Sequence, residues 1–119
     1  MSLLVHTYVY DADGAHDFLE DPEDGRSLAG FESTRARLWG GQPMRDLGLR
    51  FFPRLRHGDL YVERDDIDDF LAECQTLRPH LDSLAHQGGY GVDYVAERFA
   101  NIVAAAVRAK AHGGGIVIW

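Results

Sequence analysis

The chain has 119 residues, 45% of them hydrophobic, and a formal net charge of −7 from 19 acidic and 12 basic residues. This length fits one domain with a hydrophobic core of its own. The negative charge disfavours nonspecific binding to nucleic acid, which depends on neutralising phosphates, and no apolar run approaches the roughly 18 residues of a membrane span.

A single cysteine, Cys74, excludes an internal disulfide and favours a reducing, cytoplasmic location. The opening segment MSLLVHTYVYD has no basic start and only a short, interrupted apolar stretch, so we expect no secretion signal. The basic residues are eleven arginines and one lysine, Lys110. Together with the many alanines and glycines, this composition favours a bacterial source with a GC-rich genome.

The charges are distributed unevenly along the chain. Residues 11–24 hold seven acids and no base, and residues 59–73 hold seven acids and one arginine. Residues 25–58, between them, carry seven arginines and two acids, a net charge of +5 (7 − 2). The order along the chain is therefore acidic, basic, acidic.

The first predicted element is a strand over residues 3–10, because LLVHTYVY is rich in β-branched and aromatic residues. Both of its faces carry apolar side chains, which is typical of an interior strand. Gly14, Pro22 and Gly25 then predict a loop, with a short helical turn over residues 15–19.

The middle of the chain is less regular. Residues 31–41 are interpreted as a strand, and residues 44–55 alternate in part but contain Pro53, which interrupts a central strand. A turn at residues 57–59 precedes a short predicted strand over residues 60–63.

Two helices and a final strand are predicted next. Ile67, Phe70, Cys74 and Leu77 recur at helical spacing, and Asp65 is the candidate N-cap. Pro79 predicts a break in this first helix near Arg78. A second helix is predicted from residue 93 to its end at Gly113, and a short apolar strand follows over residues 115–119.

The predicted fold class is therefore α+β. We expect residues 1–119 to form a single globular domain, with a mostly antiparallel sheet of about four to five strands. Two C-terminal helices should pack on one face of this sheet.

No motif indicates a metal site or a catalytic residue. The DADG segment lacks the calcium-loop pattern, because Ala15, His16 and Pro22 occupy positions that require an oxygen ligand, Gly and Glu. None of the six histidines forms a pair four residues apart, and Cys74 lies on an apolar helix face. We therefore expect no metal, no cofactor and no catalytic residue.

The acids at the start of the first helix exceed what capping requires. One or two acids there gain roughly 0.3–1 kcal/mol each from the helix dipole, whereas like charges three or four residues apart oppose each other by a few tenths of a kcal/mol. This excess favours a surface for a basic protein partner. The predicted contact residues are Asp65, Asp66, Asp68, Asp69 and Glu73, with a second acidic edge formed by Asp11, Asp13, Asp17, Glu20 and Asp21.

The leading hypothesis is a non-enzymatic protein-binding module. Its size, its charge and its lack of catalytic motifs match an immunity or antitoxin protein, which inhibits a basic partner such as a nuclease. In this hypothesis Arg50, Arg54 and Arg56 are internal counter-charges or a dimer contact.

Two alternatives remain open. The first is a small enzyme or ligand-binding domain with a cleft beside the sheet, lined by His6, His57, Asp59, Tyr61 and Glu63. The second is a homo-oligomeric structural protein, most simply a homodimer, in which the acids solubilise one face or meet the arginines of residues 35–56 of another copy.

Overall fold

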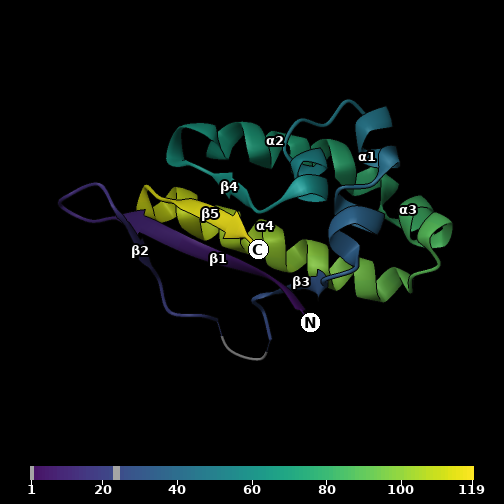
Figure 1. Ribbon diagram of the computed structural model, residues 1–119, viewed down its shortest axis with the longest axis horizontal. Helices are drawn as coiled ribbons and strands as arrows, with labels where there is room; N and C mark the ends of the chain where they lie inside the picture. Colours follow the sequence, from purple (N-terminus) through teal and green to yellow (C-terminus); the bar gives the residue numbers. More distant parts are fainter. Residues whose placement is uncertain (1, 23–24) are drawn as a thin grey trace.

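Five strands form one antiparallel sheet, and the long helix Val92–His112 runs along it (Figure 1). We describe it from a computed structural model of residues 2–22 and 25–119; Glu23 and Asp24 of the first acidic segment lie outside the described residues. The strands are β1 Ser2–Tyr10, β2 His16–Phe18, β3 Leu28–Phe31, β4 Leu60–Val62 and β5 Gly115–Ile118. The fold is α+β, as predicted.

The long strand β1 organises the sheet. It pairs with β5 along one edge, with β3 near its beginning and with β2 at its end. β4 pairs with the other edge of β5, so the order is β2-β1-β5-β4. The strand predicted over residues 115–119 is confirmed as β5, and all four of its residues are buried between its neighbours.

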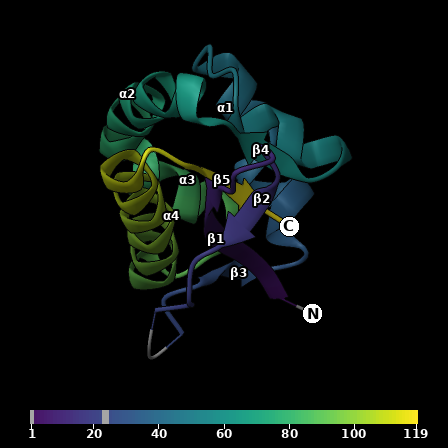
Figure 2. The ribbon, with the colours of Figure 1, turned by 90° about the vertical axis from the view of Figure 1, so that its left-hand side faces the viewer.

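The helices α2 Ile67–Leu77, α3 Leu81–Gly88 and α4 Val92–His112 follow the strand β4. Viewed from the end of the β1–β2 hairpin, α2 and α4 lie on the same side of the strands (Figure 2). α4 buries Phe99 and Ile102 in the main core. Its Ala105 carbonyl accepts a hydrogen bond from Thr7 Oγ1 of β1 at 2.9 Å, which identifies the inner face of the sheet.

The break at Pro79 and the end of the last helix agree with the prediction, whereas the predicted N-cap of the first helix does not. Pro79 lies in a short 3-10 helix, Arg78–His80, that separates α2 from α3, because proline removes a backbone donor and restricts the residue before it. Gly113 ends α4 with a φ of 67°, a left-handed conformation that glycine adopts easily. At the start of α2 the cap is Asp66, one residue beyond the predicted Asp65, after the 3-10 turn Arg64–Asp66.

The strand predicted over residues 31–41 is wrong beyond Phe31. A π-helical turn Arg35–Trp39, the short helix α1 Gln42–Asp46 and a 3-10 helix Phe52–His57 occupy this region. Trp39 explains the difference, since its indole is fully buried and its Nε1 donates a hydrogen bond to the Ala29 carbonyl at 2.8 Å.

The helical turn predicted over residues 15–19 is also wrong, because His16–Phe18 forms the strand β2. Asp11 Oδ1 accepts hydrogen bonds from the backbone N–H groups of Asp13 and Ala15, both at 2.9 Å, and Gly14 has a φ of 81°. These contacts close a turn that leads the chain back along β1.

Glu73 lies inside the protein, with 8% of its surface exposed. Its carboxylate accepts hydrogen bonds from three consecutive backbone N–H groups, those of Arg50 at 2.5 Å, Phe51 at 3.0 Å and Phe52 at 3.0 Å. The prediction that Glu73 belongs to an exposed contact patch is therefore wrong. Its role is to join α2 to the segment that leads into the 3-10 helix Phe52–His57.

In the described part of the chain, no helix is both long and apolar enough to cross a membrane.

Replacing Glu73 with Ala should lower the free energy of unfolding by about 3 kcal/mol, because three backbone donors in a largely buried site lose their acceptor. Glu73→Gln should lower it less, since the amide oxygen still accepts hydrogen bonds. Glu97, on α4 with a side chain 72% exposed, provides the control, and Glu97→Ala should change the value by less than about 0.5 kcal/mol. Urea denaturation followed by circular dichroism measures all three, and equal stability of Glu73→Ala and Glu97→Ala would refute this role.

Candidate functional site

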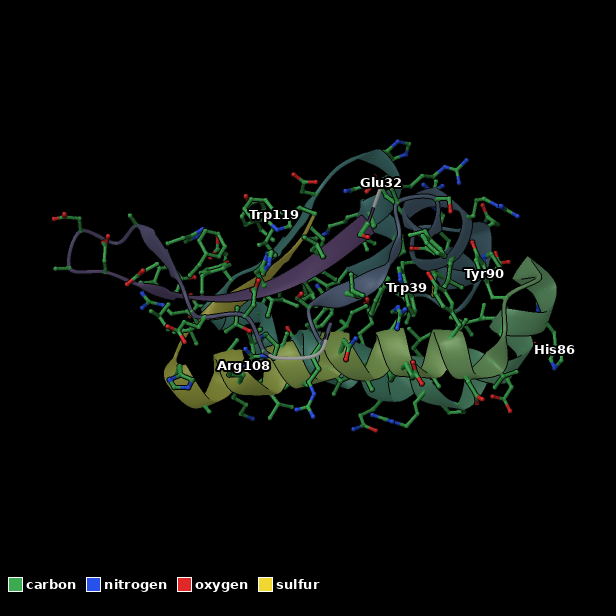
Figure 3. All side chains as sticks on the ribbon, turned by 90° about the horizontal axis from the view of Figure 1, so that it is seen from below. Glu32, Trp39, His86, Tyr90, Arg108 and Trp119 are labelled. Carbon is green, nitrogen blue, oxygen red and sulfur yellow. The ribbon has the colours of Figure 1, made fainter. Side chains whose placement is uncertain are left out.

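The outer face of the sheet, opposite α4, is covered by aromatic and histidine side chains. Side chains alternate between the faces of a strand, and Thr7 points inward to α4, so its neighbours His6 and Tyr8 point outward. We call this surface the aromatic face; it consists of His6, Tyr8, Tyr10, His16, Phe18, Tyr61 and Trp119. Figure 3 shows the labelled Trp119 on the side of the sheet away from α4.

The rings of the aromatic face pack against one another. Trp119 stacks on Phe18 with ring centres 5.4 Å apart, and Tyr8 stacks on His16 at 3.8 Å. These rings cover Tyr8 and Val117, which are fully buried although both lie outside the main core. Phe18 and Tyr61 remain 43% and 41% exposed. The outer face is thus a second, smaller apolar layer whose outermost rings contact water.

Gly115 leaves the space on the sheet that the Tyr8 ring occupies. The two residues are directly paired across β1 and β5. A Cβ atom at Gly115 would lie 2.7 Å from the Tyr8 hydroxyl oxygen and closer still to the Val62 carbonyl oxygen. Only glycine permits so close an approach of a neighbouring ring and backbone in a strand.

Glu63 follows β4 and lies at the edge of the aromatic face. Its Oε2 accepts hydrogen bonds from the hydroxyls of Tyr8, at 2.7 Å, and Tyr10, and lies 3.4 Å from Nε2 of His16. The hydroxyl of Tyr10 also accepts a hydrogen bond from the backbone N–H of Arg64 at 3.3 Å. One carboxylate oxygen therefore connects β1, β2 and β4.

This arrangement keeps Glu63 charged and both tyrosines protonated. Partial burial acts to raise the pKa of Glu63, but the hydrogen bonds from Tyr10 and Tyr8 and the proximity of His16 outweigh it, so the pKa is lower than usual. Burial and the hydrogen bond to Glu63 raise the pKa of Tyr8 and of Tyr10. At neutral pH the site is a fixed negative charge held by two neutral hydroxyl donors.

His6 connects Trp119 to Asp21 on the part of the aromatic face away from Glu63. Its Nδ1 accepts a hydrogen bond from Nε1 of Trp119 at 2.8 Å, and its Nε2 lies 3.0 Å from Oδ1 of Asp21. Because an indole N–H only donates, Nδ1 is the acceptor and Nε2 carries the proton that faces Asp21. The segment after β2 is thereby attached to the end of β5.

The two acidic segments meet at one end of the molecule. Tyr10 and His16, the last pair before the turn of the β1–β2 hairpin, contact Glu63, which directly precedes the 3-10 turn at the start of α2. Figure 1 shows the hairpin and the start of α2 at the same, left-hand end. Residues 11–21 and 63–69 together hold ten acids and one arginine, and we call this region the acidic end.

The acids predicted from the start of α2 are exposed and partly paired. Asp65, Asp66, Asp68 and Asp69 all face solvent. Asp68 lies 2.8 Å from Nζ of Lys110, and Asp69 lies 3.5 Å from the Arg50 guanidinium. All four of these paired side chains are at least 60% exposed, so each pair contributes about 1 kcal/mol or less.

The acids of the second predicted edge lie along the β1–β2 hairpin and the segment that follows it. Asp13 and Asp17 are exposed on the hairpin and Glu20 lies just beyond it, whereas Asp11 closes the turn and Asp21 binds His6.

The structure does not bring together the five residues that were predicted to line a cleft. His6, Tyr61 and Glu63 belong to the aromatic face. Asp59 instead pairs with Arg35 at 3.2 Å, and His57 is exposed at the end of a 3-10 helix.

None of these five side chains lines the surface cavity between α1 and α3, the cavity beside β3, the cavity beside α2 or the cavity between the π-helical turn and α3. One cavity of about 200 Å³ between α1 and α3 is lined by Asp46, His80 and Ser83. No hydrogen bond joins these three side chains. Ser83 Oγ accepts a hydrogen bond from Gln87 and Asp46 accepts one from Gln42, so each of these two side chains is bonded within its own helix. Within residues 2–22 and 25–119, no three His, Cys, Asp or Glu side chains are grouped closely enough to hold a metal ion.

Sequence reasoning missed Tyr8, Tyr10, His16, Phe18 and Trp119 as members of the site. The alternation of Tyr8 and Tyr10 in β1 was visible, as was that of His16 and Phe18. The acidic, glycine-containing surroundings of the second pair concealed the strand β2.

Comparisons of the chain with protein families, with curated proteins and with solved structures find no match.

Gly115→Ala should lower the free energy of unfolding by about 2 kcal/mol or more, because the new methyl group overlaps Tyr8 and the Val62 carbonyl. Gly58 is the matched control: its φ of 167° is extended, and a Cβ atom added there would have no other atom within 4 Å, so Gly58→Ala should be close to neutral. Thermal and urea denaturation give both values. A neutral Gly115→Ala would contradict the close packing of Tyr8.

Tyr10→Phe should raise the pKa of Glu63, because it removes a hydrogen bond that stabilises the charged carboxylate. A lowered folded-state pKa stabilises the protein above the unfolded-state pKa, and this stabilisation disappears as the pH falls through the folded-state value. The variant should therefore lose less stability on acidification than the wild type. An NMR titration of the Glu63 carboxyl carbon measures the pKa. Tyr61→Phe is the control, and it should leave the Glu63 pKa unchanged.

Proposed function

We propose that this protein is a non-enzymatic binding module for a basic protein, which it contacts with the aromatic face and the acidic end. The observation that carries the proposal is a layer of packed rings, with Phe18 and Tyr61 in solvent, bordered by the carboxylates of Asp21 and Glu63. Exposed aromatic side chains on a rigid support are typical centres of protein interfaces. Surrounding charges select the partner and accelerate the encounter.

The charge of this region favours a basic partner over a second copy of the chain. A symmetric dimer whose twofold axis passes through the acidic end would bring ten acids of one copy against ten of the other, with one arginine on each side. Such like-charge contact is unfavourable, whereas a basic surface would neutralise it. The two ion pairs at the start of α2 are exposed and weak, so they leave these carboxylates available.

The chemistry of Glu63 favours binding over catalysis. A general base works best when its pKa is near the working pH. Hydrogen bonding moves the pKa of Glu63 downward, away from neutrality, and burial moves those of Tyr8 and Tyr10 upward. These groups are therefore better suited to hold a fixed charge than to exchange protons with a substrate.

An immunity-like or antitoxin-like role in a bacterial cytoplasm is the specific form of the proposal. Such a protein blocks a basic, phosphate-binding surface by placing carboxylates where phosphates would lie. The small size of this chain, its acidic end and its sheet, which carries the packed rings, support this form by analogy with small acidic inhibitors.

The test is capture from extracts of the native host with tagged wild-type protein and three variants, Phe18→Ser, Tyr61→Ser and Phe31→Ser. Phe31 is the matched control, because it is 62% exposed and stacks on one ring, Tyr94, away from the aromatic face. Wild type and Phe31→Ser should retain a basic protein that Phe18→Ser and Tyr61→Ser bind at least about tenfold more weakly.

Salt should slow the association of wild-type protein with that partner, because screening weakens the attraction of exposed charges. Circular dichroism confirms that each variant is folded. The proposal fails if no protein is retained in a manner that depends on Phe18 and Tyr61, or if the retained protein is acidic.

A further inference from the structure

We propose that Glu63 and Tyr61 form a binding site for one arginine side chain of the partner. This arginine site rests on the proposed function and specifies the chemistry at the centre of the contact.

The first support is the state of the Glu63 carboxylate. Its Oε2 is occupied by Tyr8, Tyr10 and His16, whereas its Oε1 accepts no hydrogen bond and forms no ion pair with any residue of 2–22 and 25–119. The side chain is 47% exposed, and among the described residues only the Tyr90 hydroxyl is both buried and unpartnered, so the unpartnered Oε1 faces solvent. A carboxylate that is charged, fixed by two hydroxyl donors and open on one oxygen is arranged to accept a charge-assisted hydrogen bond from outside.

The second support is the neighbouring ring. Tyr61 lies two residues before Glu63, so both side chains project from the same side of the strand, roughly 7 Å apart along it. The Tyr61 ring is 41% exposed, and its centre lies 5.8 Å from that of His16, which contacts Oε2 of Glu63. The exposed Tyr61 ring and the Glu63 carboxylate therefore both adjoin His16 on the aromatic face.

A guanidinium group matches both features at once. It is planar, it donates several hydrogen bonds in its plane to a carboxylate, and it stacks on an aromatic ring with its flat surface. A lysine ammonium is compact and more strongly hydrated, so it satisfies the carboxylate without covering the ring. The chain already places an arginine over a tyrosine of this face, since the Arg64 guanidinium lies 4.6 Å from the centre of the Tyr10 ring.

The test uses two short neutral-capped peptides, acetyl-Gly-Arg-Gly-amide and its lysine counterpart, titrated into the isotopically labelled full chain and followed by NMR. The arginine peptide should shift the signals of Tyr61, Glu63 and Tyr10, and should bind several-fold more tightly than the lysine peptide. Equal affinity for the two peptides, or shifts centred on Asp65–Asp69, would overturn the proposal.

Two variants separate the parts of the site. Glu63→Gln retains an acceptor for the tyrosine hydroxyls but removes the charge, and it should weaken the arginine peptide about tenfold. Tyr61→Leu should weaken it about threefold through loss of the ring. Glu97→Gln, an exposed acid on α4, is the control and should bind as the wild type does. Unchanged affinity in Glu63→Gln, with its NMR spectrum showing a folded protein, would refute the arginine site.

The arginine site and the proposed function fail in different ways. If a captured basic partner binds Glu63→Gln and wild type equally while Phe18→Ser and Tyr61→Ser remain defective, the proposed function stands and the arginine site is wrong. If no basic partner is captured by the wild-type chain, the proposed function itself is wrong, whatever the peptides do.

Discussion

The packing of Tyr8 across Gly115 is the constraint on which the outer half of this protein depends. β1 is buried on both sides, with Thr7 bonded to α4 on the inner face and Tyr8 covered by rings on the outer face. Because Gly115 has no side chain, the Tyr8 ring lies flat enough for its hydroxyl to reach Glu63 beyond β5. Together with the hydrogen bond from Tyr10, the one from Tyr8 connects the strand β1 to the edge of the candidate site.

Two buried or half-buried carboxylates in this acidic protein perform opposite tasks. Glu73 is enclosed, and three backbone N–H groups satisfy it, so its charge is used to position a loop against α2. Glu63 is satisfied on one oxygen and exposed on the other, so part of its charge faces solvent. Sequence position alone does not distinguish these two acids, because both lie in the same acidic segment. The number and direction of the hydrogen-bond donors around each carboxylate distinguish the structural acid from the candidate binding acid.

The pairing of the strands brings together acidic segments that are far apart in the sequence. The two acidic segments are separated by the arginine-rich residues 25–58, yet the antiparallel pairing of β1, β5 and β4 brings the ends of β1 and β4 to the same edge. The arginine-rich middle segment lies mainly in the short helical turns between β3 and β4. Of its arginines, Arg50 pairs with an acid of α2 and Arg35 pairs with Glu32 and Asp59, so the internal neutralisation of the acidic end is limited.

Periodicity and composition alone determined the α+β class, the central strands β1 and β5, the two main helices with their break at Pro79, and the exposure of the acids at the start of α2. Local signals of this kind persist in the fold because the spacing of apolar residues decides which face of an element is buried. The conformation of residues 31–57, the burial of Glu73 and the assembly of the aromatic face were decided only by tertiary structure. Each of these depends on contacts between residues far apart in the chain, such as Trp39 with Ala29, Glu73 with Phe51 and Tyr10 with Glu63. No local pattern encodes such contacts, since the partner group is brought into place only when the sheet and helices pack together.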